Sequence, residues 1–118
     1  MPAHLDTGRR GEDLAAQLLL GKGYELVARN YRAGRGEVDL IVRNEKTLVF
    51  VEVKTRTNLA FGMPEAAVSR RKAALITQAA DAYIFSTDWH GNIRFDVVAV
   101  VLRPHQPPEV VHFEDAFF

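Results

Sequence analysis

The chain has 118 residues, of which 47% are hydrophobic and 25% charged, and its 15 basic residues balance 15 acidic ones. This is the composition of an ordinary soluble domain with enough apolar residues for a core, and we expect one domain over residues 1–118. The absence of cysteine excludes disulfides and thiolate metal sites. No apolar run is long enough to cross a membrane, and the N-terminus lacks the apolar segment of a signal peptide, so we expect a cytoplasmic protein.

The first half of the chain predicts one helix and three strands. Residues 7–20 show a broad apolar arc at helical spacing, and Glu12 falls in the middle of that arc. Residues 24–31, 37–43 and 48–56 have strand composition and are separated by turn residues at 34–36 and 44–47. We therefore expect an antiparallel meander of three strands.

The second half of the chain predicts a second helix and further strands. After a loop that contains the stretch FGMP (61–64), Ser69 is the expected N-cap of a helix that reaches about Phe85. Residues 93–102 form a long apolar strand, and residues 109–113 are a candidate short edge strand. The pattern predicts an α/β fold with a mixed sheet flanked by helices.

A carboxylate and an ammonium, those of Glu52 and Lys54, lie within the apolar strand VFVEVKTR (49–56), although an unpaired buried charge costs several kcal/mol. Alternation along strands places Glu52 and Lys54 on one face, and Glu37 and Asp39 on one face of the preceding strand. A four-residue turn would pair Asp39 with Glu52, whereas a two-residue turn would pair Glu37 with Glu52. Both registers bring an acid beside Glu52.

Two neighbouring carboxylates repel each other unless a cation lies between them. Lys54 is one candidate, and a divalent metal with oxygen ligands is another. If the first helix covers this face of the sheet, Glu12 joins Asp39, Glu52 and Lys54 in one cluster. The alternative is a buried ion pair that only fixes the strand register, and such pairs contribute little net stability.

The motifs GRRGE (8–12), GEVDLI (36–41) and VFVEVKTR (49–56) resemble those of the PD-(D/E)xK nuclease superfamily. Within it, the chain is similar to archaeal Holliday-junction resolvases and, over nearly its whole length, to the YraN-type family of uncharacterised bacterial proteins. The resemblance implies a restriction-endonuclease-like fold, although Val38 replaces the proline of the signature.

The resemblance also implies roles for individual residues. Asp39, Glu52 and the backbone carbonyl of Val53 would hold Mg²⁺ or Mn²⁺, and Glu12 would contribute through a metal-bound water. Lys54 would orient the attacking water or stabilise the charge that develops on the phosphate. The implied reaction is metal-dependent hydrolysis of a phosphodiester in DNA, with branched or single-stranded DNA as candidates.

Basic residues are concentrated between residues 54 and 72, so a neutral total charge is compatible with a basic face. The candidate phosphate contacts are Arg32, Arg35, Arg56, Arg70, Arg71 and Lys72. For Lys72, a contact with phosphate at the rim of the site and a side chain that merely reaches solvent remain alternatives. We expect Arg94 and Asp96 to form a structural ion pair instead of contacting the site.

Two functions from different classes remain open at this stage. The first is a metal-dependent endonuclease, and the second is an accessory protein that binds nucleic acid and cuts little or nothing. Resolvases of similar pattern act as two-fold dimers, so a homodimer is a candidate assembly.

Overall fold

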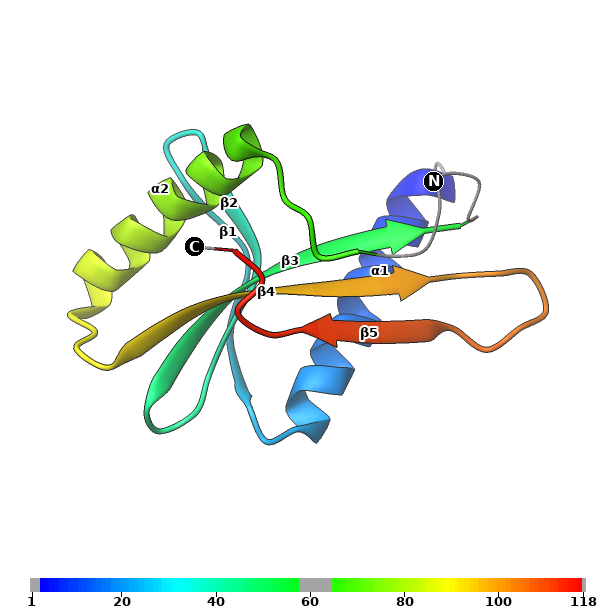
Figure 1. The fold of residues 1–118 in the computed structure, drawn as a ribbon, viewed down its shortest axis with the longest axis horizontal. Helices are drawn as coiled ribbons and strands as arrows, with labels where there is room; N and C mark the ends of the chain where they lie inside the picture. The colour runs from blue at the N-terminus through cyan, green and yellow to red at the C-terminus, as the bar shows by residue number, and fades with distance from the viewer. Residues whose placement is uncertain (1–2, 58–64, 118) are drawn as a thin grey trace.

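The computed structural model describes residues 3–57 and 65–117, with side chains from residue 7 onward. The elements in chain order are α1 (Ala3–Gly21), β1 (Glu25–Ala33), β2 (Gly36–Arg43), β3 (Thr47–Arg56), α2 (Arg70–Thr87), β4 (Asn92–Val101) and β5 (Glu109–Phe113). The strands form one sheet in the order β1-β2-β3-β4-β5, in which only β3 and β4 are parallel (Figure 1). The predicted α/β fold is confirmed, and the arrangement is compatible with a restriction-endonuclease-like fold. The FGMP stretch (61–64) lies outside the described residues.

The two helices cover opposite faces of the sheet (Figure 1). The core on the α1 side joins Ala15, Ala16 and Leu19 to Leu40, Val42, Val49, Val51, Val98 and Val100. The core on the α2 side joins Ile76, Ala79 and Ala80 to Val38, Ile41, Leu48 and Phe50. Within the described residues, neither helix is long and apolar enough to cross a membrane.

Helix α2 connects the parallel strands β3 and β4 and begins where the sequence predicts. Ser69 is its N-cap, and the Ser69 hydroxyl accepts a hydrogen bond of 3.1 Å from the backbone N–H of Lys72. The helix lies very close to the start of β2, because a Cβ atom at Gly36 would lie 2.6 Å from the Leu75 carbonyl oxygen and 2.7 Å from the Ala79 nitrogen. Glycine at position 36 therefore sets the distance between α2 and β2.

The hairpin between β2 and β3 adopts the four-residue turn. The Asn44 side-chain oxygen accepts hydrogen bonds from the N–H groups of Lys46 (3.0 Å) and Thr47 (2.8 Å). This local bonding is typical of asparagine in turns. The resulting register pairs Arg43 with Leu48 and Leu40 with Val51. Of the two registers compatible with the sequence, the structure thus has the one that brings Asp39 opposite Glu52.

Strands β2 and β3 separate from each other beyond this hairpin. Pairing between β2 and β3 ends at Leu40 and Val51, whereas β2 stays paired with β1 as far as Gly36. Strand β3 stays paired with β4 as far as Arg56. Figure 1 shows the β1–β2 pair and the β3–β4–β5 group diverging in this way. Asp39 and Glu52 lie at the point of divergence, where backbone pairing no longer fills the space between the strands.

Candidate functional site

Asp39 and Glu52 face each other where β2 and β3 separate. The Asp39 Oδ2 atom accepts a hydrogen bond of 2.8 Å from the backbone N–H of Val53, so this carboxylate takes the place of the missing strand partner. Glu52 is only 8% exposed. Its Oε2 atom is buried without a hydrogen-bond partner among the described residues. A buried carboxylate oxygen without a donor is unusual, because such atoms are nearly always paired in folded proteins.

Both carboxyl groups resist ionisation in this environment. Burial, followed by the negative charge of Asp39, raises the pKa of Glu52 to about 7, and the ammonium of Lys72 offsets part of this rise. Burial also raises the pKa of Asp39, although the N–H of Val53 and the charge of Lys72 act against the rise. A second positive charge between the two groups would favour the ionised form of both.

The two lysines near the acid pair have different partners. The Lys72 ammonium, from the first turn of α2, lies 3.6 Å from Glu52 Oε1. The Lys54 ammonium donates hydrogen bonds to the backbone carbonyls of Ala67 and Glu65, in the segment that leads into α2. Burial lowers the pKa of Lys54. The ammonium with a direct contact to the acid pair therefore comes from α2.

Glu12 does not join the acid pair through the face of the sheet that the sequence suggested. Helix α1 packs on the side of Val51, whereas Glu52, the next residue on β3, points to the other side. The Glu12 carboxylate accepts a hydrogen bond of 3.1 Å from the Asn30 side chain on β1. Burial raises the pKa of Glu12, the Asn30 bond opposes this, and the charge of Asp39 adds to the rise. Glu12 thus lies close enough to Asp39 for the two charges to interact.

The donor set fits a hard divalent cation held in part by water. Among residues 7–57 and 65–117, no three His, Asp or Glu side chains come together as a metal-binding group. Asp39 and Glu52 would therefore share the ion with backbone carbonyl and water oxygens, which is the ligand chemistry that Mg²⁺ prefers. The unpartnered Oε2 atom of Glu52 is a carboxylate oxygen available to such an ion.

A pocket of about 370 Å³ opens beside Glu52. It is lined by Glu52, Val53, Lys54, Thr55, Arg56, Ala67, Val68, Ser69 and Lys72. These residues come from the second half of β3, from the segment that leads into α2 and, for Lys72, from the first turn of α2. The pocket thus has a buried acid, while its more exposed lining carries three basic side chains.

The predicted phosphate contacts fall into two groups. Arg56, Arg70 and Arg71 lie at the end of β3 and the start of α2, near the pocket, and are exposed. Arg32 and Arg35 are exposed at the turn between β1 and β2, and Arg32 lies 3.6 Å from the Glu37 carboxylate. The first group is therefore the one adjacent to the acid pair.

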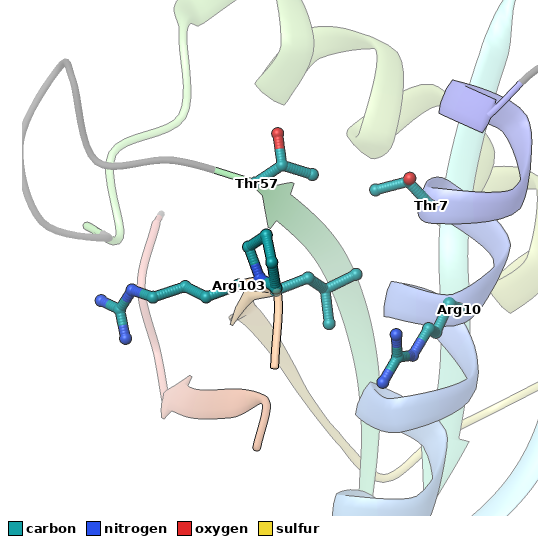
Figure 2. Close-up of a pocket in the computed structure, with 6 residues that line it drawn as sticks. Thr7, Arg10, Thr57 and Arg103 are labelled. Atoms are coloured by element: carbon teal, nitrogen blue, oxygen red, sulfur yellow. The ribbon is translucent and has the colours of Figure 1, made fainter. Parts of the chain in front are cut away.

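A second pocket, of about 380 Å³, lies on the α1 side of the molecule (Figure 2). Thr7 and Arg10 line it from α1, and Thr57 lines it from the end of β3. Arg103 also contributes, but its guanidinium points away and lies 3.1 Å from the Glu109 carboxylate. Arg10 is not recognisable as a pocket residue from the sequence pattern, because the pattern does not show how α1 lies over the sheet.

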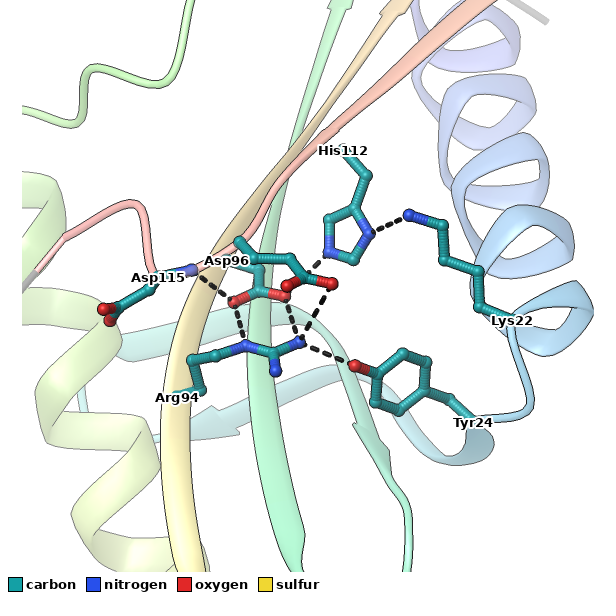
Figure 3. Close-up of polar contacts among 7 residues, drawn as sticks. Lys22, Tyr24, Arg94, Asp96, His112 and Asp115 are labelled. Atoms are coloured by element: carbon teal, nitrogen blue, oxygen red, sulfur yellow. Dashed lines mark hydrogen bonds and ion pairs between the residues drawn. The ribbon is translucent and has the colours of Figure 1, made fainter.

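The Arg94–Asp96 pair is structural, as the sequence suggested. Asp96 is fully buried and accepts hydrogen bonds of 2.8 and 2.9 Å from Arg94, 2.7 Å from His112 and 3.0 Å from the N–H of Asp115 (Figure 3). Burial alone would raise the pKa of Asp96, but these hydrogen bonds together lower it. The network joins β4 to β5 and to Tyr24 after α1, and Glu52 has no part in it.

Comparison with known proteins identifies the family. The model of "Uncharacterised protein family UPF0102" matches residues 11–100. A UPF0102 protein of Flavobacterium psychrophilum is 40% identical over 118 residues, which cover 100% of this chain and 98% of that protein. A UPF0102 protein of Geotalea uraniireducens is 46% identical over 111 residues, or 93% and 87% of the two chains. A third, from Clavibacter michiganensis, is 46% identical over 93% and 94% of the two chains. The chain therefore belongs to the UPF0102 family, the YraN-type family that its motifs indicated.

Proposed function

We propose that this protein is a cytoplasmic, metal-dependent endonuclease that binds Mg²⁺ or Mn²⁺ at Asp39 and Glu52 and hydrolyses phosphodiester bonds in DNA. One observation carries the proposal: a buried carboxyl group with an unpartnered oxygen, that of Glu52, faces the half-buried carboxyl group of Asp39 beside a pocket lined by basic residues. A protein gains no stability from such a pair, because both groups are desolvated and repel each other. A ligand that is itself a cation accounts for the pair better.

The proposed role of each residue follows from the charge of its side chain. Asp39, Glu52 and the carbonyl of Val53 would hold the ion, and Glu12 would contribute through a water molecule. The ion would lower the pKa of the attacking water and polarise the scissile phosphate. The exposed arginines at the end of β3 and the start of α2 would bind the phosphates of the DNA backbone (Arg56, Arg70, Arg71). Arg32 and Arg35 would extend this contact, and an ammonium group in the pocket would face the reacting phosphate.

The second candidate function is an accessory protein that binds nucleic acid with little or no cleavage. It is favoured by the ion pair between Lys72 and Glu52, which already places a cation at the acid pair. It is also favoured by the location of Glu12, whose carboxylate accepts a hydrogen bond from Asn30 and forms no three-acid group with Asp39 and Glu52. In this case the arginines would bind the DNA backbone without metal.

Calorimetric titration with Mg²⁺ and Mn²⁺ separates the two functions. We expect the wild type to bind one ion, and Asp39→Ala and Glu52→Ala to lose more affinity than the roughly 10–100-fold that an outer-shell partner contributes. Glu45→Ala is the matched control, because Glu45 is exposed on the turn between β2 and β3. The same proteins are then incubated with duplex, single-stranded and four-way-junction DNA. Metal-dependent cleavage that the two site variants lose supports the endonuclease. DNA binding without metal binding or cleavage supports the accessory protein.

The preferred substrate bears on the assembly. Symmetric cleavage of a four-way junction needs two equivalent sites, which a two-fold homodimer provides. Sedimentation velocity at micromolar concentration, with and without DNA, measures the assembly. A strict monomer under both conditions would argue against junction resolution and favour single-stranded or duplex DNA.

A further inference from the structure

Building on the proposed function, we propose that Lys72 on α2 supplies the ammonium that faces the reacting phosphate. Lys54 on β3 is then a positioning residue that fastens the segment before α2 to the strand. This assignment differs from the one that the ExK motif implies for Lys54. It follows from the different partners of the two ammonium groups.

Lys54 is engaged with backbone. Its ammonium donates to the carbonyl oxygens of Ala67 and Glu65, two residues that precede α2. An ammonium has three N–H donors, so these contacts occupy most of its capacity. Moving it to a substrate phosphate would leave the Ala67 and Glu65 carbonyls without this donor. The contacts of Lys54 therefore hold the wall of the pocket in place.

Lys72 is held at the acid pair but not tightly. The hydroxyl of Ser69 accepts a hydrogen bond from the Lys72 backbone N–H, which fixes the first turn of α2 beside the pocket. The ammonium lies 3.6 Å from Glu52 Oε1, longer than the 2.7–2.9 Å or so of a charge-assisted hydrogen bond. The Lys72 side chain is 42% exposed, whereas that of Glu52 is 11% exposed. Lys72 thus reaches both the acid and the solvent-filled side of the pocket.

This position suits two successive roles. Without metal, Lys72 balances part of the negative charge of Asp39 and Glu52. If Asp39 and Glu52 held a divalent ion, the ion would neutralise the negative charge that attracts the ammonium of Lys72. The ammonium, on the first turn of α2, would then be free to contact a phosphate oxygen.

Three single substitutions test the assignment: Lys72→Met, Lys54→Met and, as a control, Lys46→Met. Lys46 is exposed on the turn between β2 and β3, apart from the acid pair and the proposed DNA contacts, and its removal changes the net charge equally. Metal affinity is measured by calorimetry with Mg²⁺ and Mn²⁺. Amide hydrogen exchange without metal reports the opening of the first turn of α2, and cleavage of the preferred DNA reports activity.

The proposal expects a distinct pattern for each variant. Lys72→Met binds metal about tenfold more tightly, because a competing charge is removed, and loses about 100-fold in cleavage rate. Its exchange pattern in α2 stays close to that of the wild type. Lys54→Met keeps its metal affinity within about twofold, while exchange at the start of α2 accelerates about tenfold or more. Lys46→Met leaves metal affinity, exchange and cleavage rate unchanged.

Other results overturn the assignment in ways that separate it from the proposed function. Tighter metal binding and lost cleavage in Lys54→Met, with Lys72→Met like the wild type, would restore the role that the motif implies. Equal effects of both lysines on metal affinity would also refute the assignment. If wild type binds metal but cuts no DNA, only the proposed nuclease activity fails. The metal affinities and exchange rates of the variants still support or refute the assignment of the two lysines. If wild type binds no metal, both fail.

Discussion

Replacing Glu52 by glutamine is expected to stabilise the metal-free protein at pH 8. Glutamine has nearly the same shape but cannot ionise, so it removes the cost of a buried charge. The pKa of Glu52 is about 7 in the folded protein, against an ordinary value of 4.5. At about 1.36 kcal/mol per pKa unit, this difference corresponds to about 3 kcal/mol of unfolding free energy.

Two contributions reduce the net gain. The variant loses the ion pair with Lys72, which is about 0–1 kcal/mol for a partly exposed pair at 3.6 Å. It also adds an amide group that must find hydrogen bonds, although the Asp39 carboxylate is a possible acceptor. We therefore expect a net stabilisation of about 1–2 kcal/mol at pH 8.

The sign of the pH dependence follows from the raised pKa. Between pH 4.5 and about 7 the folded protein holds a proton on Glu52 that the unfolded chain has released. The contribution of Glu52 to the unfolding free energy of the wild type is therefore fully present below pH 4.5, and it declines as the pH rises to about 7. The variant does not titrate at this position, so its advantage over wild type is small at pH 4.5 and levels off above pH 7.

Urea unfolding at pH 4.5, 6 and 8 in EDTA measures the difference in unfolding free energy between wild type and Glu52→Gln. We expect the urea concentration at the midpoint to shift while the dependence of the free energy on urea stays the same. Glu45→Gln is the control, because Glu45 is exposed on a turn and its substitution is expected to change stability by less than about 0.5 kcal/mol. Added Mg²⁺ should reverse the order at pH 8, because wild type gains about 2.7 kcal/mol at 100 times its Kd and the variant gains little. A variant that is less stable than wild type at pH 8 without metal, or a difference that does not vary with pH, would refute the reasoning.

Two further predictions concern stability away from the acid pair. Asp96→Ala is expected to cost about 3–5 kcal/mol in urea unfolding, since Arg94 and His112 lose their buried partner, while the metal affinity measured by calorimetry stays unchanged. A loss below about 1 kcal/mol would mean that the network contributes little to the junction of β4 and β5. Gly36→Ala is expected to lower stability by about 1–3 kcal/mol, because the added methyl group would lie 2.6 Å from the Leu75 carbonyl oxygen. Unchanged thermal unfolding of this variant would show that α2 is free to move away from β2.

The helices and strands could be predicted from local patterns. The N-cap at Ser69, the turn at 44–47 and the edge strand at 109–113 all lie where the sequence places them. Each depends on residues adjacent in the chain, such as the asparagine that closes its own turn. Alternation along β2 and β3 also sufficed to place an acid beside Glu52. The choice between Glu37 and Asp39 rested on the turn, which the sequence left open.

The contacts between elements could not be obtained in this way. The apolar arc of α1 shows that the helix packs on a sheet, but not on which face. Only the packed structure places it beside Val51 and gives Glu12 a partner on β1, Asn30. Likewise, the spacing of Lys54 from Glu52 shows that both lie on one strand face, yet a lysine is long enough to reach several partners. In the structure, Lys54 donates a hydrogen bond to the Ala67 carbonyl, and Lys72 forms an ion pair with Glu52.

The sequence by itself therefore determined the family, the elements and the presence of two opposed carboxylates in an apolar sheet. These follow from local periodicity and from motifs within short segments. The tertiary structure decided which cation faces those carboxylates, because α2 reaches them from about 20 residues along the chain. It also decided that their pKa values rise, because burial is a property of the whole packed domain and not of any one segment.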